Sequence, residues 1–132
     1  MVPLEFKQIT ERLQTIKFPE FDVVIGIGSG GVPAATMLAY HLNTELLVMT
    51  LNYRDEQNKP RYESPKVIQK SEWELEGKRI LLVDDVSVSG KTMNAALEQL
   101  PGLNVKTCAM KGVADFVLFP EIKDCVKWPW NA

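Results

Sequence analysis

The chain has 132 residues, 45% hydrophobic and 24% charged, which is long enough for one domain with a single buried core. Its net charge of −2 gives no general attraction to nucleic acid or to an anionic membrane, so we expect neither as a partner. The sequence has no secretory signal at its start, and no apolar run approaches the roughly 18 residues of a membrane span. It has only two cysteines, too few for a disulfide scaffold. These observations predict a cytoplasmic protein.

The first half of the chain alternates between helical and strand patterns. Apolar residues at near-helical spacing predict an amphipathic helix over residues 4–16. The β-branched run FDVVIGI predicts a buried strand at 21–27. A helix is expected at 32–42, with Pro33 in its first turn, where proline is tolerated. A second strand, ELLVMTL, is expected at 45–51.

The second half continues this alternation after a polar stretch. Residues 52–66 have no apolar periodicity, which predicts a long mobile loop or a hairpin. The run KRILLVDD predicts a third buried strand at 78–85, followed by a helix at 91–100. A fourth strand is expected at 105–110 and a short one at 114–119.

This order of elements predicts one α/β domain over residues 1–132, with a parallel, twisted sheet covered by helices on both faces. In such sheets, ligands bind beyond the carboxyl ends of the strands. Three loops leave those ends, at 26–32, 52–66 and 84–91, and they contain the least ordinary residues of the sequence. We therefore expect a ligand site there, and an enzyme rather than a scaffold.

The loop GIGSGG at 26–31 matches the spacing G-x-G-x-x-G. A dinucleotide site also needs an acid about 20 residues further on, at the end of the second strand, to hold the ribose. Here that strand ends in TLNY, and no acid occurs before Asp55. A different anion site is favoured, and a tight strand-to-helix turn is the structural alternative.

The loop DDVSVSGKTM at 84–93 carries the more specific signal. A nucleotide-binding P-loop would need glycine at position 85, where the sequence has Asp85, so that interpretation fails. Hydroxyls, a glycine and free N–H groups at a helix start can bind a phosphate. The two acids need hydroxyls or a metal as partners, and a sugar phosphate supplies the hydroxyls. The alternative is a pair of solvated acids followed by an ordinary turn.

Together these motifs resemble those of the type I phosphoribosyltransferases. LLVDDVSVSGKTM resembles the family's PRPP-binding motif, GIGSGGVPAA its pyrophosphate loop, and the Asn-Tyr pair at 52–53 its mobile-loop Ser-Tyr. The C-terminal segment resembles that of the small bacterial xanthine-guanine branch. The similarity begins near residue 20 and covers most of the chain.

The resemblance implies a role for each of these segments. Asp84 and Asp85 would contact the ribose hydroxyls directly or through Mg²⁺, and Tyr53 would close over the reaction. The 5′-phosphate would lie against Val88, Ser89, Gly90, Lys91 and Thr92. The pyrophosphate would lie along Gly28, Ser29, Gly30 and Gly31, with a cis peptide bond at Gly28–Ser29. The base would contact Lys111, Cys125 and Val126.

The function implied is Mg²⁺-dependent transfer of ribose 5-phosphate from PRPP to a nitrogen base, with release of pyrophosphate. A purine-type base is favoured, which would place the protein in nucleotide metabolism and purine salvage. A minimal C-terminal hood over the base and a homodimer are also implied.

Three residues depart from the family pattern. The 6-oxopurine enzymes have an Asp where this chain has Val88, which cannot move a proton. The purine branch has Arg or Lys at the position of Ser29, and a base-stacking aromatic at the position of Cys125. These losses motivate an alternative, a non-catalytic sensor that binds PRPP or a nucleotide, while an enzyme stays the favoured class. An RNA-binding regulator is disfavoured by the acidic composition.

Several residues have two interpretations. Lys111 either reads the exocyclic oxygen of a purine or is a solvated lysine. Trp128 and Trp130 either form a base-binding hood or close an apolar edge, and packing is favoured. His41 is expected to be structural or exposed. Three cations of the 52–66 loop either supply the charge missing at position 29 or are ordinary loop residues: Arg54, Lys59 and Arg61.

Overall fold

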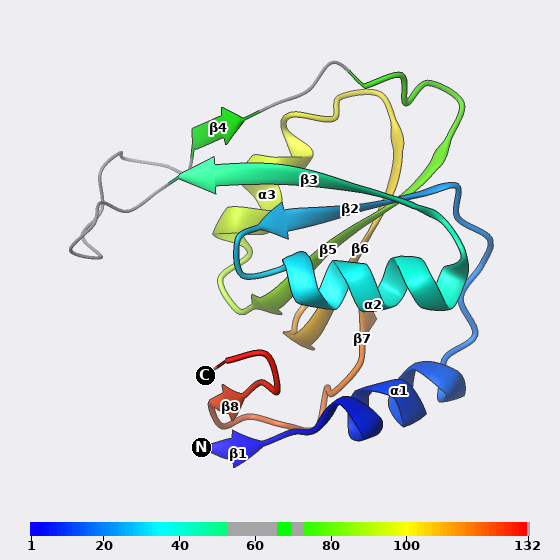
Figure 1. Ribbon diagram of the computed structural model, residues 1–132. Helices are drawn as coiled ribbons and strands as arrows, with labels where there is room; N and C mark the ends of the chain where they lie inside the picture. Colours follow the sequence, from blue (N-terminus) through cyan, green and yellow to red (C-terminus); the bar gives the residue numbers. More distant parts are fainter. Residues whose placement is uncertain (53–65, 70–72, 132) are drawn as a thin grey trace.

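The computed structural model describes residues 1–52, 66–69 and 73–131, and in these residues six strands form the central sheet. Their order is β4-β3-β2-β5-β6-β7 (Figure 1). Five strands are mutually parallel: β2 (Val23–Gly28), β3 (Glu45–Asn52), β5 (Arg79–Ser87), β6 (Asn104–Gly112) and β7 (Phe116–Val117). The short β4 (Lys66–Gln69) pairs antiparallel with β3. The expected α/β fold is therefore confirmed.

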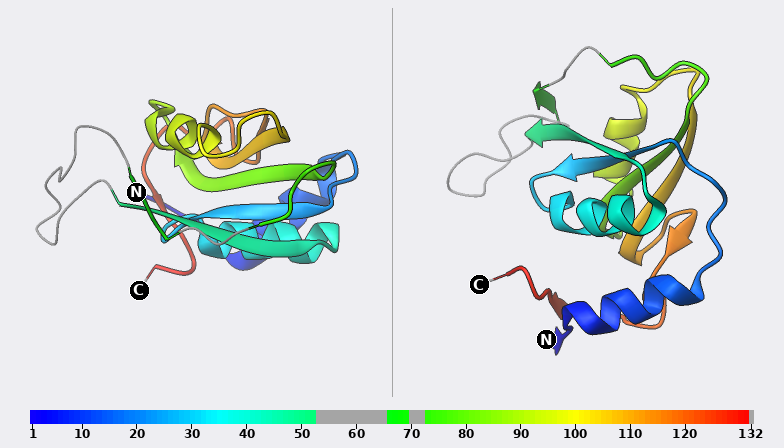
Figure 2. Two further views of the ribbon diagram at one scale, coloured as in Figure 1. Left: turned by 90° about the horizontal axis from the view of Figure 1, so that it is seen from above. Right: turned by 45° about the vertical axis from the view of Figure 1, so that its right-hand side comes forward.

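Helices cover both faces of the sheet, as the sequence predicted. The left view of Figure 2 shows α3 (Lys91–Leu97) on one side and α1 (Phe6–Thr15) and α2 (Val32–Leu42) on the other. Side chains alternate between the two faces along each strand, so Val24 packs against α1 and α2, and Val23 packs toward α3. This is why the strands read as continuous apolar runs.

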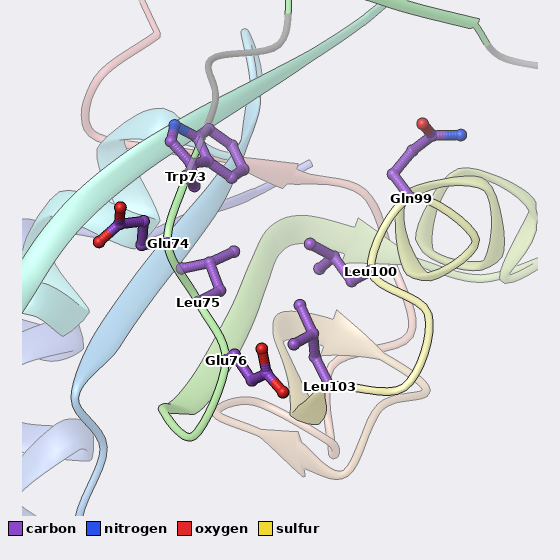
Figure 3. Close-up of a pocket in the computed structure, with 7 residues that line it drawn as sticks. All are labelled: Trp73, Glu74, Leu75, Glu76, Gln99, Leu100 and Leu103. Carbon is purple, nitrogen blue, oxygen red and sulfur yellow. The ribbon is translucent and has the colours of Figure 1, made fainter.

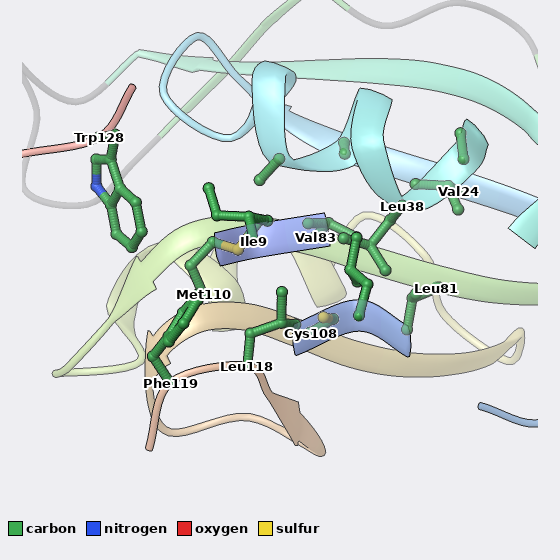
Figure 4. Close-up of a cluster of buried hydrophobic side chains, with 14 of the residues drawn as sticks. Ile9, Val24, Leu38, Leu81, Val83, Cys108, Met110, Leu118, Phe119 and Trp128 are labelled. Carbon is green, nitrogen blue, oxygen red and sulfur yellow. The ribbon is translucent and has the colours of Figure 1, made fainter. Parts of the chain in front are cut away.

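The core beneath α1 and α2 is the larger of the two clusters (Figure 4). Ile9 of α1 and Leu38 of α2 are fully buried in it, against Leu81 and Cys108 of the sheet. The second cluster contains Met93 and other residues of the α3 side. No helix of the described residues is long and apolar enough to cross a membrane.

Helix ends follow local chemistry. The first helix begins two residues after the predicted start, where the Glu5 N–H donates to Gln8 Oε1 at 2.7 Å, a bond typical of helix starts. The third helix ends at Leu97 rather than at position 100. Beyond Leu97 the chain forms a tighter turn, in which the Leu100 N–H donates to the Leu97 carbonyl, three residues earlier, and Pro101 follows.

A second, two-stranded sheet joins the two ends of the chain and was not predicted. In it, β1 (Val2–Pro3) pairs parallel with β8 (Val126–Lys127). The Val2 N–H donates to the Cys125 carbonyl at 2.8 Å, and the Leu4 N–H donates to the Lys127 carbonyl at 3.1 Å. The N-terminal residues therefore lie beside the C-terminal segment that the sequence assigned to the hood (Figures 1 and 2).

The C-terminal tryptophans stack on each other. Their ring centroids are 5.3 Å apart with the planes nearly parallel at 5°, and Trp130 also lies 6.2 Å from Phe6. Trp128 is 4% exposed and belongs to the larger core cluster. The favoured interpretation, that the Trp128 side chain packs, is confirmed. His41 is exposed at the end of α2, with its ring in a T-shaped arrangement with Phe18, as expected for a structural or exposed residue.

Candidate functional site

The two motif loops meet because the strands that precede them are neighbours. Strands β2 and β5 pair in parallel, with Gly26 opposite Val83, so both carboxyl ends fall at the same edge of the sheet. The loop after β2 begins with a cis peptide bond at Gly28–Ser29, as the family resemblance implied. Asp84 and Asp85 lie near the end of β5, which ends two residues later than predicted.

The glycine loop lies directly against the two acids. A β-carbon at Gly31 would come 3.0 Å from Asp84 Oδ1 and 2.7 Å from the Ile27 carbonyl oxygen, so no larger residue fits at position 31. A β-carbon at Gly30 would lie 3.3 Å from Asp85 Oδ2. The structure thus brings the expected pyrophosphate loop and the expected ribose-binding acids into contact.

Asp84 and Asp85 have different surroundings. Asp84 is 7% exposed, and its Oδ1 accepts from the Asp85 N–H at 2.8 Å. Burial, followed by hydrogen bonding and charge repulsion from Asp85, raises the pKa of Asp84 to about 8. Asp85 is half-buried, and its Oδ1 accepts from the Val86 N–H at 2.8 Å. Two adjacent carboxyl groups of this kind favour a cation or hydroxyl donors between them.

A magnesium ion fits this donor set. Mg²⁺ prefers oxygen ligands, keeps several waters, and is commonly held by one or two carboxylates together with substrate phosphates. The described residues contain no group of three or more His, Cys, Asp or Glu side chains that could hold a metal. Asp84 and Asp85 are the carboxylates that would hold the ion, as the family resemblance implied, with water and substrate oxygens as its other ligands.

The loop expected to hold the 5′-phosphate lies between β5 and α3. Residues 86–93 enclose a small cavity of about 30 Å³. Gly90 has φ of 78°, a left-handed conformation that suits glycine, and its carbonyl accepts from the Asn94 N–H at 2.8 Å. The Lys91 N–H donates to Ser89 Oγ at 3.3 Å. Hydrogen bonds within the loop, from its backbone and from the Ser89 side chain, thus hold its conformation.

A second cavity, of about 230 Å³, adjoins this loop through Val88. It is lined by Val88, Lys111, Gly112, Val113, Pro120, Ile122 and Lys123. We call it the acceptor cavity. It adjoins the loop that the family resemblance assigns to the 5′-phosphate, and it is lined by Lys111, which the resemblance assigns to the base. Five of these lining residues were not predicted. Gly112 and Val113 directly follow Lys111, which was their only signal in the sequence, and Pro120, Ile122 and Lys123 had none.

Lys111 is not a solvated lysine. It is 8% exposed, and its Nζ donates to the Asp124 carbonyl at 2.7 Å and to the Lys123 carbonyl at 3.4 Å. The solvated interpretation is therefore wrong, because the charged group lies inside the protein and is matched to two backbone carbonyls. A role in binding the base stays a prediction.

Cys125 and Val126, the other expected base contacts, are not among the lining residues of the acceptor cavity. Cys125 is exposed, and Val126 pairs with Val2 in the two-stranded sheet. Their contact with a base stays a prediction. Tyr53 and the loop cations Arg54, Lys59 and Arg61 lie outside the described residues.

A cavity of about 590 Å³ lies at the other end of the sheet (Figure 3). It is lined by residues that precede β5 and β6: Trp73, Glu74, Leu75, Glu76, Gln99, Leu100 and Leu103. These residues are at the amino ends of the strands, away from the motif loops. Volume alone therefore does not locate the functional site.

A model of the phosphoribosyl transferase domain matches residues 5–114. The chain belongs to this family. The resemblance to the type I phosphoribosyltransferases, and the fold it implied, are thereby confirmed.

Curated relatives of this phosphoribosyl transferase domain have more than one function. The transcriptional regulator GfcR of Methanococcoides burtonii is 31% identical to it over 107 residues, which are 81% of this chain and 51% of the relative. The orotate phosphoribosyltransferase of Sulfurisphaera tokodaii is 30% identical over 90 residues, covering 68% of this chain and 42% of the relative. The chain thus spans about half the length of these relatives.

Solved structures match the phosphoribosyl transferase domain over nearly its whole length. A purine phosphoribosyltransferase from Pyrococcus horikoshii has a TM-score of 0.81 at 23% identity, covering 99% of this chain and 94% of that one. A hypothetical protein from Neisseria gonorrhoeae with bound ppGpp has a TM-score of 0.71 at 25% identity, covering 99% and 90%. At 23% identity, the first likeness shows the fold alone.

Proposed function

We propose that this protein binds Mg²⁺ and PRPP at the carboxyl ends of β2 and β5 and transfers ribose 5-phosphate to a nitrogen base, releasing pyrophosphate. The observation that carries the proposal is the contact between the Gly30–Gly31 backbone and the carboxylates of Asp84 and Asp85. This contact places a backbone suited to an anion beside side chains suited to a ribose diol and a cation.

Each part of the site has a task in the proposal. Asp84 and Asp85 accept hydrogen bonds from the ribose hydroxyls and hold the metal. Bound Mg²⁺ would supply positive charge against the leaving pyrophosphate. The 28–31 loop lies along the pyrophosphate, and residues 88–92 wrap the 5′-phosphate. With both ends of PRPP held, C1 of the ribose faces the acceptor cavity, and orientation of the two reactants is the main source of catalysis.

The acceptor cavity receives the base. Val88 has a 74% exposed side chain at the start of the phosphate loop and offers only an apolar surface to that base. Residue 88 therefore takes no part in proton transfer, and the base must lose its proton to solvent or to another group. A purine-type base is favoured by the family resemblance, and similarity to an orotate phosphoribosyltransferase makes a pyrimidine the next acceptor to test.

A second candidate function is non-catalytic sensing of PRPP or a nucleotide at the same site. It is favoured by Val88, Ser29 and Cys125, which replace residues that help the family's purine enzymes. Similarity to transcriptional regulators and to a protein with bound ppGpp supports it as well. In either case the proposal includes a cytoplasmic location and a homodimer, both of which rest on the sequence and the family resemblance.

The deciding experiment offers the purified protein PRPP, Mg²⁺ and a mixed panel of purine and pyrimidine bases, with products followed by mass spectrometry. The Asp85→Asn variant is the blank. A new nucleotide mass that is absent with the variant identifies the base and establishes the enzyme. If no product forms while calorimetry shows PRPP binding, the sensor function replaces transfer. If calorimetry shows binding of neither PRPP nor any nucleotide, both functions are wrong.

A further inference from the structure

One wall of the acceptor cavity comes from a segment without regular secondary structure. Residues 118–127, which we call the hood segment, run from the end of β7 past α1 to β8 (Figure 1). Pro120, Ile122 and Lys123 of this segment line the cavity together with Val88. Because residues 118–125 form neither helix nor strand, the position of this wall depends on the contacts that hold the segment from outside.

Several contacts hold the hood segment along its length, among them hydrogen bonds from the Leu118 and Phe119 N–H groups to the Ala109 and Met110 carbonyls of β6. At its end, β1 pairs with β8. In its middle, Lys111 Nζ donates to the carbonyls of residues 123 and 124. At its start, the Arg12 guanidinium of α1 contacts residues 118, 119 and 121 through hydrogen bonds and a ring contact.

The Arg12 guanidinium uses both of its Nη groups as hydrogen-bond donors and also lies near an aromatic ring. Nη1 donates to the Leu118 carbonyl and, at 3.0 Å, to Glu121 Oε1. Nη2 donates to Glu121 Oε2 at 2.8 Å, which completes a bidentate pair. The guanidinium carbon also lies 4.5 Å from the centroid of the Phe119 ring. A planar fork is suited to holding a carboxylate, a carbonyl and a ring face together, and lysine is not.

The helix that carries Arg12 is itself firmly placed. Ile9 and Leu13 are 0% and 2% exposed in the core against α2 and the sheet. An ordinary surface ion pair contributes little to stability, but this one is bidentate, joins residues 109 positions apart, and is reinforced by a ring contact. Arg12 thus ties the start of an irregular segment to a fixed point of the fold.

We propose that Arg12 is a positioning residue for the acceptor cavity: it holds the hood segment so that residues 120–123 form the wall against the base. The inference rests on the proposed function, because it takes the ribose phosphate to lie at residues 84–92 and the base to lie in this cavity. Loss of the Arg12 contacts leaves the ribose-phosphate site intact and weakens recognition of the base.

The test uses calorimetry on the full chain with Mg²⁺ to measure how much a base adds to the affinity for a ribose phosphate. Ribose 5-phosphate reports on the phosphate and ribose contacts alone, and GMP, AMP, UMP and orotidine 5′-monophosphate add a base. The quantity of interest is the ratio of the affinity for the best-bound nucleotide to that for ribose 5-phosphate. This readout applies whether the protein is an enzyme or a sensor.

In Arg12→Ala, we expect this ratio to fall roughly tenfold while the affinity for ribose 5-phosphate is unchanged. Arg12→Lys keeps the charge without the fork and should restore only part of the ratio. Arg79→Ala is the matched control. It removes a bidentate pair with Asp22 at the amino ends of β2 and β5, and it should leave the ratio as in the wild type.

The proposal is overturned if Arg12→Ala lowers both affinities alike, leaves the ratio unchanged, or shares its effect with Arg79→Ala. It is also overturned if no nucleotide binds the wild type more tightly than ribose 5-phosphate does. If neither PRPP nor ribose 5-phosphate binds, the proposed function is wrong as well, which separates the two failures. Should Arg12→Ala not fold, Glu121→Ala removes the partner from the hood side, and the same selective loss is expected.

Discussion

The backbone of Gly31 lies so close to the Asp84 carboxyl group that a β-carbon at position 31 would come 3.0 Å from Asp84 Oδ1. The same β-carbon would come 2.7 Å from the Ile27 carbonyl oxygen, and a backbone atom cannot move aside cheaply. The loop that follows β2 and the acids that end β5 therefore form one unit. A substitution in either segment should therefore displace the other.

We expect Gly31→Ala to lower the free energy of unfolding by about 1–3 kcal/mol through overpacking, and to abolish PRPP binding by displacing the loop from the acids. Gly102→Ala is the control, because Gly102 has φ of 74° and nothing within 4 Å of an added β-carbon. This substitution should lower the free energy of unfolding by about 1–2 kcal/mol through backbone strain alone, and it should leave PRPP binding intact. Urea unfolding and calorimetry give the two quantities, and equal loss of binding in both variants would contradict the shared site.

We expect Asp85→Asn to reduce binding of PRPP in the presence of Mg²⁺ below detection. The amide keeps the shape of the side chain but removes the charge that would hold the cation. Chelation of Mg²⁺ from the wild-type protein should have the same effect. Asp22→Asn, at the other end of the sheet, should bind as the wild type does. Unchanged calorimetry for Asp85→Asn would remove the basis for assigning the site to these acids.

The two cysteines should differ in their reactivity. Burial raises the pKa of Cys108 to about 12, whereas Cys125 is exposed in the hood segment. The thiolate is the reactive form, so at pH 8 a disulfide reagent should titrate the Cys125 thiol quickly and the Cys108 thiol only after unfolding. A Cys125→Ser variant should then show no fast reaction. Rapid labelling of Cys108 in the folded protein would contradict its place in the core.

Acid should weaken the ion pair that joins the starts of β2 and β5. Hydrogen bonds from Arg79 hold the pKa of Asp22 well below its usual range, and those from Arg12 lower the pKa of Glu121 to about 2. A lowered acid pKa in the folded state adds stability above the ordinary pKa of about 4, and this stability is lost as the pH falls toward the folded value.

Asp22→Asn should therefore have a lower melting temperature than the wild type at pH 7, and the difference should shrink as the pH is lowered from 5 toward 2. Added salt should shrink it too, because both partners reach solvent. Melting curves across this pH range test the expectation. A difference that stays constant with pH would mean that the Asp22 charge is not what stabilises the fold.

The elements that hold the site were visible in the sequence because their signals are local. Strand β2 and helix α2 were located from a β-branched run and from a proline at a helix start, and α2 has the predicted bounds. Asp84 and Asp85 were assigned to the site because a strand end and a glycine loop occur together within ten residues of sequence. Parallel pairing of β2 and β5 then brings them to Gly31 without any further information.

The contacts that hold the hood segment could not be predicted from local sequence patterns. Strands β1 and β8 have two residues each, too few for periodicity, and each has its partner at the opposite end of the chain. The partners of Arg12 lie 106 and 109 positions away, so nothing in its neighbourhood marks it as anything but a surface charge. Lys111 was left open between two interpretations until its burial was known.

The sequence by itself determined the family, the α/β order of elements and the acids and glycines of the candidate site, because backbone preference and apolar periodicity act over a few residues. Only the tertiary structure decided how the acceptor cavity is walled, that Lys111 points inward, and that Arg12 of the first helix holds the hood. Those features depend on contacts between distant segments, and such contacts exist only once the core has brought the segments together.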